Sequence, residues 1–238
     1  DAPVGSGPFK FKEYRAGQYY ALTRFDGYWN GKPKLDSVTY RFAKDSNSVN
    51  LALQNGEINL KMIDPQDVSR LKKTDKFNFV TYPEGRLAYM VFNQNVPVMQ
   101  SKALRQAIAY ALNKNDLVTT AFTSLDYAKP ATSFLTPDTL YHSDDVEQYA
   151  YDLEKAKALL KASGAPSDLK LRLAYINTNK TQESMALYIQ QQLKALGINV
   201  ELLPLDANAM SQRSLDMKNT GYELSLGGYI MGSEPDGY

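Results

Sequence analysis

The sequence has 238 residues, no cysteine, one histidine and a formal net charge of +1. Its balance of charges disfavours a nucleic-acid-binding or polybasic membrane-surface protein, because both need a basic surface. The lack of cysteine excludes disulfides, cysteine nucleophiles and zinc sites built from cysteine and histidine clusters. We therefore expect no metal and no cofactor.

The first third of the chain is predicted to be rich in strands, because apolar and polar residues alternate there. The expected strands cover residues 8–14, 19–25, 36–43, 77–82 and 87–92. Gly17 indicates a hairpin turn between the first two. Two short helices are expected, one capped by Asp45 and one beginning at Asp64 with Pro65 in its first turn.

From residue 101 the apolar residues take helical spacing. One helix is expected from residue 101 to about residue 122, and a second over residues 153–163, ending at Gly164. The stretch between them, residues 129–145, is rich in Pro, Ser and Thr and is predicted to be a loop.

Strands and helices then alternate. Strands are expected over residues 169–175, 198–202 and 222–228, with helices beginning after Asn179 and Asp206. This order predicts an α/β fold with a parallel sheet covered by helices on both faces. Ligands of such sheets bind beyond the carboxyl ends of the strands. The candidates at those ends are Asn177, Gly228, Tyr229, Met231 and Glu234.

Two alternatives remain open from the residues alone. Tyr229 and Met231 fit ligand contact and packing against a neighbouring strand equally well. The acidic residues of the pairs Asp144–Asp145 and Glu234–Asp236 would permit an acid-dependent hydrolase. However, no partner nucleophile, metal set, Walker A loop or GxGxxG motif accompanies them, so a non-enzyme is predicted.

Several segments, in order along essentially the whole chain, resemble motifs of the family 5 extracellular solute-binding proteins, the oligopeptide- and dipeptide-binding group. They include VGSGPFKF at residues 4–11, ALQNGEI at 52–58, LRQAIAYAL at 104–112 and QQQLKALGI at 190–198. Each motif is weak by itself, and the ordered set is specific.

The resemblance implies a type II periplasmic-binding-protein-like fold, in which two α/β lobes close a hinged cleft on a solute. Residues 1–85 would form an incomplete first lobe and residues 86–238 the second, with the chain crossing between lobes at residues 82–88. The chain is expected to be part of a longer protein. The implied function is to capture peptides in the interlobe cleft and deliver them to the permease of a bacterial ABC importer. That protein would be a monomer, located in the periplasm or held at the cell surface as a lipoprotein. A nickel complex or an oligosaccharide as ligand, and a peptide-signal receptor or adhesin role, are the alternatives.

The resemblance also bears on the ligand contacts. Arg86 is expected to face the interlobe space, and Tyr89 and Asn93 are expected to contact the ligand as well. Peptide-binding members carry Trp at the position of Gly228 and, at that of Met231, an Asp that pairs with the ligand's α-amino group. Either Glu234 or Asp236 takes over this role, or the ligand is held through its backbone and apolar parts. In the second case an N-acetylated peptide should bind nearly as well as the free amine, and Met231→Asp should create a preference for the free amine.

Overall fold

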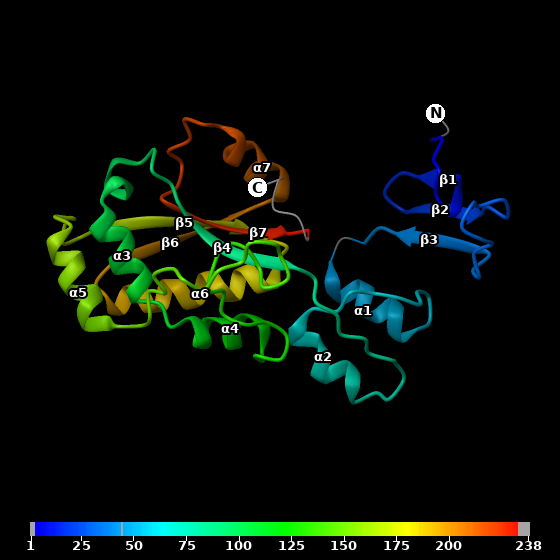
Figure 1. Cartoon of the computed structure of the whole chain (residues 1–238), viewed down its shortest axis with the longest axis horizontal. Helices are drawn as coiled ribbons and strands as arrows, with labels where there is room; N and C mark the ends of the chain where they lie inside the picture. The colour runs from blue at the N-terminus through cyan, green and yellow to red at the C-terminus, as the bar shows by residue number, and fades with distance from the viewer. Residues whose placement is uncertain (1–2, 44, 233–238) are drawn as a thin grey trace. The chain divides into compact units, whose positions relative to one another are not determined.

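The computed structural model describes residues 3–43 and 45–232 (Figure 1). It divides into two compact units, Asp1–Met62 and Ile63–Tyr238, called unit 1 and unit 2 below. Helix α2 (Pro65–Lys72) belongs to unit 2, where Gln66 donates a hydrogen bond of 2.7 Å to the Ala121 carbonyl. The division into residues 1–85 and 86–238 as two lobes stays a prediction. The lobe crossing at residues 82–88 stays a prediction.

Unit 1 contains the predicted hairpin. Its elements are the strands β1 (Phe9–Arg15), β2 (Tyr19–Arg24) and β3 (Ser37–Arg41) and the helix α1 (Ser46–Gln54). The strands pair antiparallel in the order β1-β2-β3, and Asp45 caps α1 as expected. Phe11, Tyr20 and Tyr40 stack across one face of the sheet, with ring centroids 5.6 and 6.3 Å apart. Within the three strands Ala21 alone is buried, so this sheet has little core of its own.

Unit 2 holds the predicted alternation of strands and helices. In chain order its remaining elements are β4 (Arg86–Phe92), the 3₁₀ helix η1 (Pro97–Gln100), α3 (Lys102–Tyr110), α4 (Lys114–Phe122), α5 (Leu153–Ala162), β5 (Lys170–Ile176), α6 (Lys180–Ala195), β6 (Asn199–Leu205), α7 (Ala207–Leu215) and β7 (Leu224–Ile230). Its strands form one sheet in the order β4-β7-β5-β6. β5 runs parallel to both β6 and β7, as predicted, and β4 pairs antiparallel with β7.

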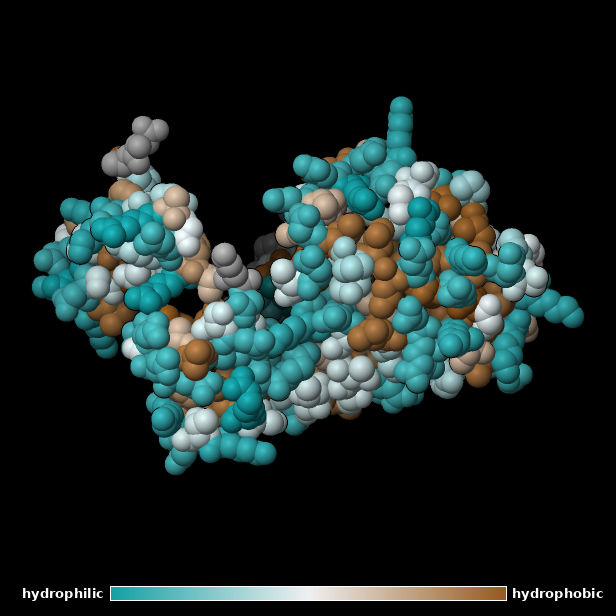
Figure 2. All heavy atoms as spheres, turned by 180° about the vertical axis from the view of Figure 1, so that it is seen from behind, coloured by the Kyte–Doolittle hydropathy of each residue, from teal (hydrophilic) through white to brown (hydrophobic). Residues whose placement is uncertain are grey.

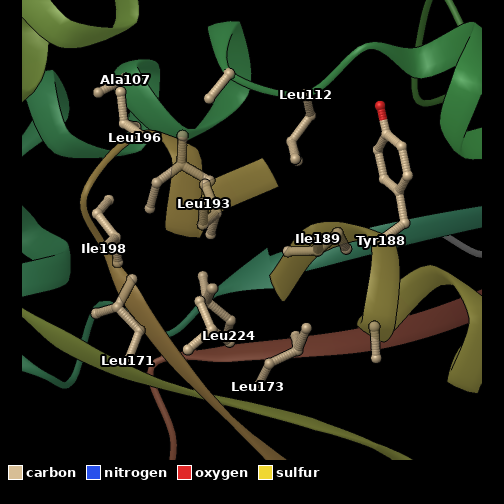
Figure 3. Packing of buried hydrophobic residues seen from close by; sticks show 14 of the residues in the cluster. Ala107, Leu112, Leu171, Leu173, Tyr188, Ile189, Leu193, Leu196, Ile198 and Leu224 are labelled. Carbon is tan, nitrogen blue, oxygen red and sulfur yellow. The ribbon is translucent and has the colours of Figure 1, made fainter. Parts of the chain in front are cut away.

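Helices cover both faces of this sheet. On one face the core joins the sheet to α3, α4, α5 and α6; Ile189 and Leu193 of α6 pack with Leu171, Leu173 and Leu224 of the strands (Figure 3). On the other face α7 packs through a smaller cluster. Burial of side chains of this size contributes about 1.5–3 kcal/mol each, so unit 2 carries most of the chain's apolar stabilisation.

Two predicted elements are wrong. Residues 77–82 form no strand, because alternation alone does not make one without a partner to pair with. The helix expected over residues 101–122 is two helices, α3 and α4. Asn113 separates them, since its side-chain oxygen accepts hydrogen bonds from the backbone N–H groups of Asn115 and Asp116 at 3.1 and 3.4 Å and thereby starts α4.

The surface of unit 2 is mixed. In the space-filling view its apolar residues gather in patches within a mostly polar surface (Figure 2). Exposed apolar side chains of this unit include Val91, Phe134 and Tyr229. Among the described residues, no helix combines the length and the apolar character needed to cross a bilayer.

Candidate functional site

The parallel strands β5, β6 and β7 end at Ile176, Leu205 and Ile230, and the antiparallel β4 begins beside them at Arg86. We call this side of the sheet the carboxyl edge and the opposite side the amino edge. Polar groups gather at both edges, and their surroundings differ.

Arg86 and Gly228 lie together at the carboxyl edge. Arg86 is paired with Ile230 in the β4–β7 ladder, and its guanidinium lies 3.7 Å from the place that a Cβ on Gly228 would occupy. The same guanidinium donates to both oxygens of Glu84, at 2.9 and 3.0 Å. These hydrogen bonds hold the pKa of Glu84 below its ordinary range and raise that of Arg86. The ionised pair of Glu84 and Arg86 is therefore accessible to solvent and lies beside the backbone of Gly228, which carries no side chain.

Sequence reasoning misses Glu84, because it lies before the strand, in the connection at residues 83–86. The signal was present: an acid and an arginine two residues apart, with Gly85 between them. Gly85 adopts a left-handed φ of 66°, and a Cβ there would lie 2.8 Å from the Met231 carbonyl oxygen. A side chain at position 85 would therefore be strained as well as crowded.

Tyr89 and Tyr229 lie on the other face of the β4–β7 pair, since successive side chains of a strand alternate between faces. The ring of Tyr89 covers Gly227 and lies 6.5 Å, between centroids, from the ring of Phe134. Tyr229 is 42% exposed. These rings provide aromatic surface close to the charged pair, on the opposite face of the same two strands.

Asn177 and Met231 are also at the carboxyl edge. The backbone N–H of Asn177 donates to the Leu205 carbonyl at 2.9 Å, and the residue is exposed just beyond β5. Met231 follows β7, and its N–H donates to the Gly85 carbonyl at 2.9 Å. Its side chain is only 6% exposed, which favours the packing alternative for Met231 over direct ligand contact.

Asn93 is not brought together with these residues. It follows β4 at the amino edge, where its amide donates to the carbonyls of Asn219 and Tyr222 at 2.9 and 2.8 Å. Near it, Arg172 and the buried Glu223 form an ion pair of 2.6 Å. The polar groups of Asn93 are thus committed to holding segments of the chain together.

The remaining candidates, Glu234 and Asp236, lie outside the described residues. Within the described part of the chain, no group of His, Cys, Asp and Glu side chains has the arrangement of a metal site. Two hollows of about 360 and 380 Å³ lie elsewhere, lined by residues of the segments 8–35 and 113–151. At the carboxyl edge Gly228, Tyr229 and Ile230 are exposed, so enclosing a ligand there would need a second wall.

Comparison with known proteins decides the family. The sequence pattern described as "Bacterial extracellular solute-binding proteins, family 5 Middle" matches residues 1–238, the whole chain. The chain belongs to this family. The family 5 assignment agrees with the ordered motifs of the sequence, and the solved relatives confirm the predicted type II periplasmic-binding-protein-like fold.

Three family 5 relatives are close over nearly all of this chain. The crystal structure of the ABC transporter substrate-binding protein CtaP from Listeria monocytogenes is 53% identical, with a TM-score of 0.89, and the match covers 100% of this chain and 49% of that one. The glutathione-binding protein GsiB of Pectobacterium atrosepticum is 32% identical over 95% of this chain and 44% of its own length. The oligopeptide-binding protein AppA of Bacillus subtilis, solved with a nonapeptide, is 28% identical, with a TM-score of 0.81, over 98% of this chain and 48% of that one. The chain thus spans about half the length of the relatives it matches.

Proposed function

We propose that this chain is part of the solute-binding protein of a bacterial ABC importer that captures peptides, with the carboxyl edge of unit 2 as one wall of the binding site. The observation that carries the proposal is the open carboxyl edge, where the guanidinium of Arg86 borders the bare backbone of Gly228. Backbone without a side chain lets an extended ligand approach closely, and the exposed guanidinium offers donors for its carbonyl or carboxylate oxygens.

The relatives support a peptide as the ligand class. AppA was solved with a nonapeptide, and GsiB is named for glutathione, itself a short peptide. A second wall, supplied by the other lobe, would close over the bound peptide, so that contacts made only in the closed form provide the affinity. The partner would be the membrane permease of the importer. The whole protein would act as a monomer in the periplasm, or at the cell surface as a lipoprotein.

The test equilibrates the whole protein with a synthetic peptide pool, removes free peptide by gel filtration and identifies the retained fraction by mass spectrometry. Capture predicts intact peptide retained in a constant molar ratio to protein. Shortened peptides that accumulate with time would instead identify the hydrolase alternative. Retention of no peptide at all would exclude peptide capture and favour a different solute.

A matched pair of variants locates the site. Tyr229→Ala removes a 42% exposed ring at the carboxyl edge, and Tyr151→Ala removes a 47% exposed ring just before α5. Loss of an aromatic ligand contact costs about 1–3 kcal/mol, roughly a five- to hundredfold loss in affinity. We expect this loss for Tyr229→Ala and none for Tyr151→Ala; equal effects would place the site elsewhere.

A further inference from the structure

The connection between α4 and α5 reaches the carboxyl edge of the sheet. Within it Thr139 is 4% exposed, and its hydroxyl donates to the carbonyl of Gly232, two residues beyond β7, at 3.4 Å. Because a hydroxyl has one proton, Thr136 donates to Thr139 in the 2.9 Å contact between their side-chain oxygens. The connection is therefore attached to the end of β7, beside the proposed ligand wall.

His142, the one histidine of the chain, fixes the shape of this connection. Its side chain is 17% exposed, and its two ring nitrogens face different acceptors. Nδ1 lies 2.8 Å from the Leu135 carbonyl oxygen and therefore donates to it, and Nε2 lies 3.2 Å from the Asp144 carboxylate. The backbone N–H of His142 also donates to the Thr139 carbonyl at 3.2 Å. Residue 135 is thus tied to the turn that contacts the end of β7.

Phe134, next to Leu135 in the chain, extends the aromatic face of the β4–β7 pair. Its ring lies 6.5 Å from that of Tyr89, between centroids, with 46° between the ring planes. Tyr89 in turn lies against the backbone of Gly227, where a Cβ would be 2.5 Å from the ring. Tyr229, two residues further along β7, faces the same side. Aromatic surface from two strands and one connection therefore meets near the carboxyl edge.

Phe134 is held in place although it is not buried. It is 56% exposed, so packing contributes little to its position, whereas the hydrogen bond from His142 fixes the neighbouring carbonyl. A ring that is fixed before a ligand arrives loses little conformational entropy on binding. Phe134 also carries no polar group, so a charged ligand side chain placed against it would lose hydration without gaining a hydrogen bond. The arrangement therefore favours an apolar ligand group.

We infer that Phe134 and Tyr89 form a subsite for an apolar side chain of the captured peptide, and that His142 is the positioning residue that holds Phe134 in that subsite. This inference rests on the proposed peptide capture and deepens it, because it names residues that select among peptides. The alternative occupant of this aromatic surface is another part of the whole protein, and the experiment distinguishes the two.

The experiment presents the whole protein with synthetic peptide pools of several lengths, in which each position carries apolar and charged residues in equal amounts. Retained peptides are sequenced by mass spectrometry, and the enrichment of apolar over charged residues is measured at each position. Phe134→Ala removes the ring, and His142→Ala releases the Leu135 carbonyl. His142→Asn is the conservative variant, because its amide nitrogen can replace Nδ1 as the donor. Tyr151→Ala is the matched control, since it removes a 47% exposed ring from the same connection, just before α5.

Wild type and Tyr151→Ala should enrich an apolar residue at one position of the peptide by roughly five- to twentyfold. The enrichment should fall to about twofold or less in Phe134→Ala, because much of the apolar contact area is lost. It should fall by a smaller factor in His142→Ala and be recovered in His142→Asn. Combining Phe134→Ala with His142→Ala should lower the enrichment no further than Phe134→Ala alone, because His142 acts through Phe134.

Unchanged enrichment in Phe134→Ala would overturn the inference, and a simultaneous loss of stability in urea would show that another part of the protein covers the ring. A less stable His142→Ala protein that keeps the full enrichment would overturn the positioning role. If Phe134→Ala retains no peptide, Phe134→Leu, which keeps an apolar side chain, must restore the enrichment, and its failure to do so counts against the inference. Uniform retention by wild type, without enrichment at any position, would overturn the subsite and leave peptide capture intact. Failure of wild type to retain any peptide would instead overturn the proposed function.

Discussion

The two edges of the sheet in unit 2 both carry an acid, an arginine and an asparagine, and they use them differently. At the amino edge, Glu223 is buried and Asn93 is half-buried, and their side chains hydrogen-bond to other parts of the chain. At the carboxyl edge, the pair of Glu84 and Arg86 is accessible to solvent, as is Asn177.

Burial and hydrogen-bond partners, not residue type, separate a structural polar cluster from a candidate binding surface. A buried polar group is costly unless its bonds are made within the protein, so it stabilises the fold and has little left for a ligand. An exposed pair contributes little stability, about 0–1 kcal/mol, and remains available for a ligand. Changes at the amino edge should therefore alter stability, and changes at the carboxyl edge should alter affinity.

The largest effect is expected from Glu223→Gln at the amino edge. The Glu223 carboxylate accepts from the backbone N–H of Arg172 at 2.7 Å and from its guanidinium at 3.0 and 2.6 Å. The amide N–H group introduced by this substitution would face the N–H groups of Arg172, and two donors cannot hydrogen-bond to each other. Because Glu223 is buried while Arg172 is partly exposed, we expect the free energy of unfolding to fall by about 2–3 kcal/mol. Urea unfolding measures this, with Glu154→Gln as the control expected to change little, because Glu154 forms an exposed ion pair with Lys157.

The pH dependence of the same variant tests the cause. Burial raises the pKa of Glu223, but the hydrogen bonds and the charge of Arg172 outweigh this and hold the pKa below its ordinary value. Because the pKa of Glu223 is lower in the folded state than in the unfolded state, the ionised carboxylate stabilises the fold at pH values above the unfolded-state pKa. This stabilisation is lost as the pH falls through the folded-state pKa. The difference between wild type and Glu223→Gln should thus be complete near neutral pH and shrink below about pH 4. A difference that is constant down to pH 3 would mean that packing, not charge, is lost.

A smaller loss is expected from Asn93→Ala, which leaves the carbonyls of Asn219 and Tyr222 without their side-chain donor. The free energy of unfolding should fall by about 1–3 kcal/mol, while peptide affinity stays unchanged. Asn95→Ala is the matched control, because the exposed Asn95 also bonds a carbonyl, that of Met217 at 2.9 Å, and water can replace it there. A loss of affinity in Asn93→Ala without a loss of stability would return Asn93 to the ligand site.

Local patterns predict unit 2 well where each element is decided by its own residues. The alternation of residues 169–175 and the cap at Asn179 predict β5 and α6 correctly, and β5 finds pairing partners in β6 and β7. The break at Asn113 was less visible, because apolar residues keep helical spacing across it while the side-chain oxygen of Asn113 caps a new helix. Residues 77–82 show the converse case, in which alternation lacks a pairing partner.

The candidate site itself stays a prediction, but the structure shows which of its expected residues share one edge of the sheet. Asn177, Gly228 and Tyr229 could be placed because the carboxyl ends of parallel strands define that edge. Asn93 lies at the opposite edge because β4 runs antiparallel to β7, and this direction could not be read from the sequence. Glu84 was missed because its closeness to Met231 depends on the register between two segments far apart in sequence, which no local pattern encodes.

The smallest effect concerns the adjacent glycines of β7, which face opposite sides of the sheet. A Cβ on Gly227 would lie 2.5 Å from the ring of Tyr89, whereas a Cβ on Gly228 would lie 3.6 Å from the nearest atom, the Leu87 carbonyl oxygen. Gly227→Ala must therefore push the tyrosine ring aside, and we expect it to lower the free energy of unfolding by about 1 kcal/mol. Gly228→Ala meets ordinary contact distances and should be neutral or stabilise by up to about 1 kcal/mol, because alanine restricts the unfolded chain.

A double-variant cycle identifies the ring as the cause. In a Tyr89→Ala background the ring is gone, so Gly227→Ala should cost nothing further, and the coupling between the two changes should equal the original loss of about 1 kcal/mol. The same cycle with Gly228→Ala should show no coupling, because position 228 faces Arg86 rather than Tyr89. If both glycines couple equally to Tyr89, or neither does, the ring does not lie on Gly227 as described. The assignment of Gly228 to the side of β7 that faces Arg86 would then fail with it, since both follow from the same register.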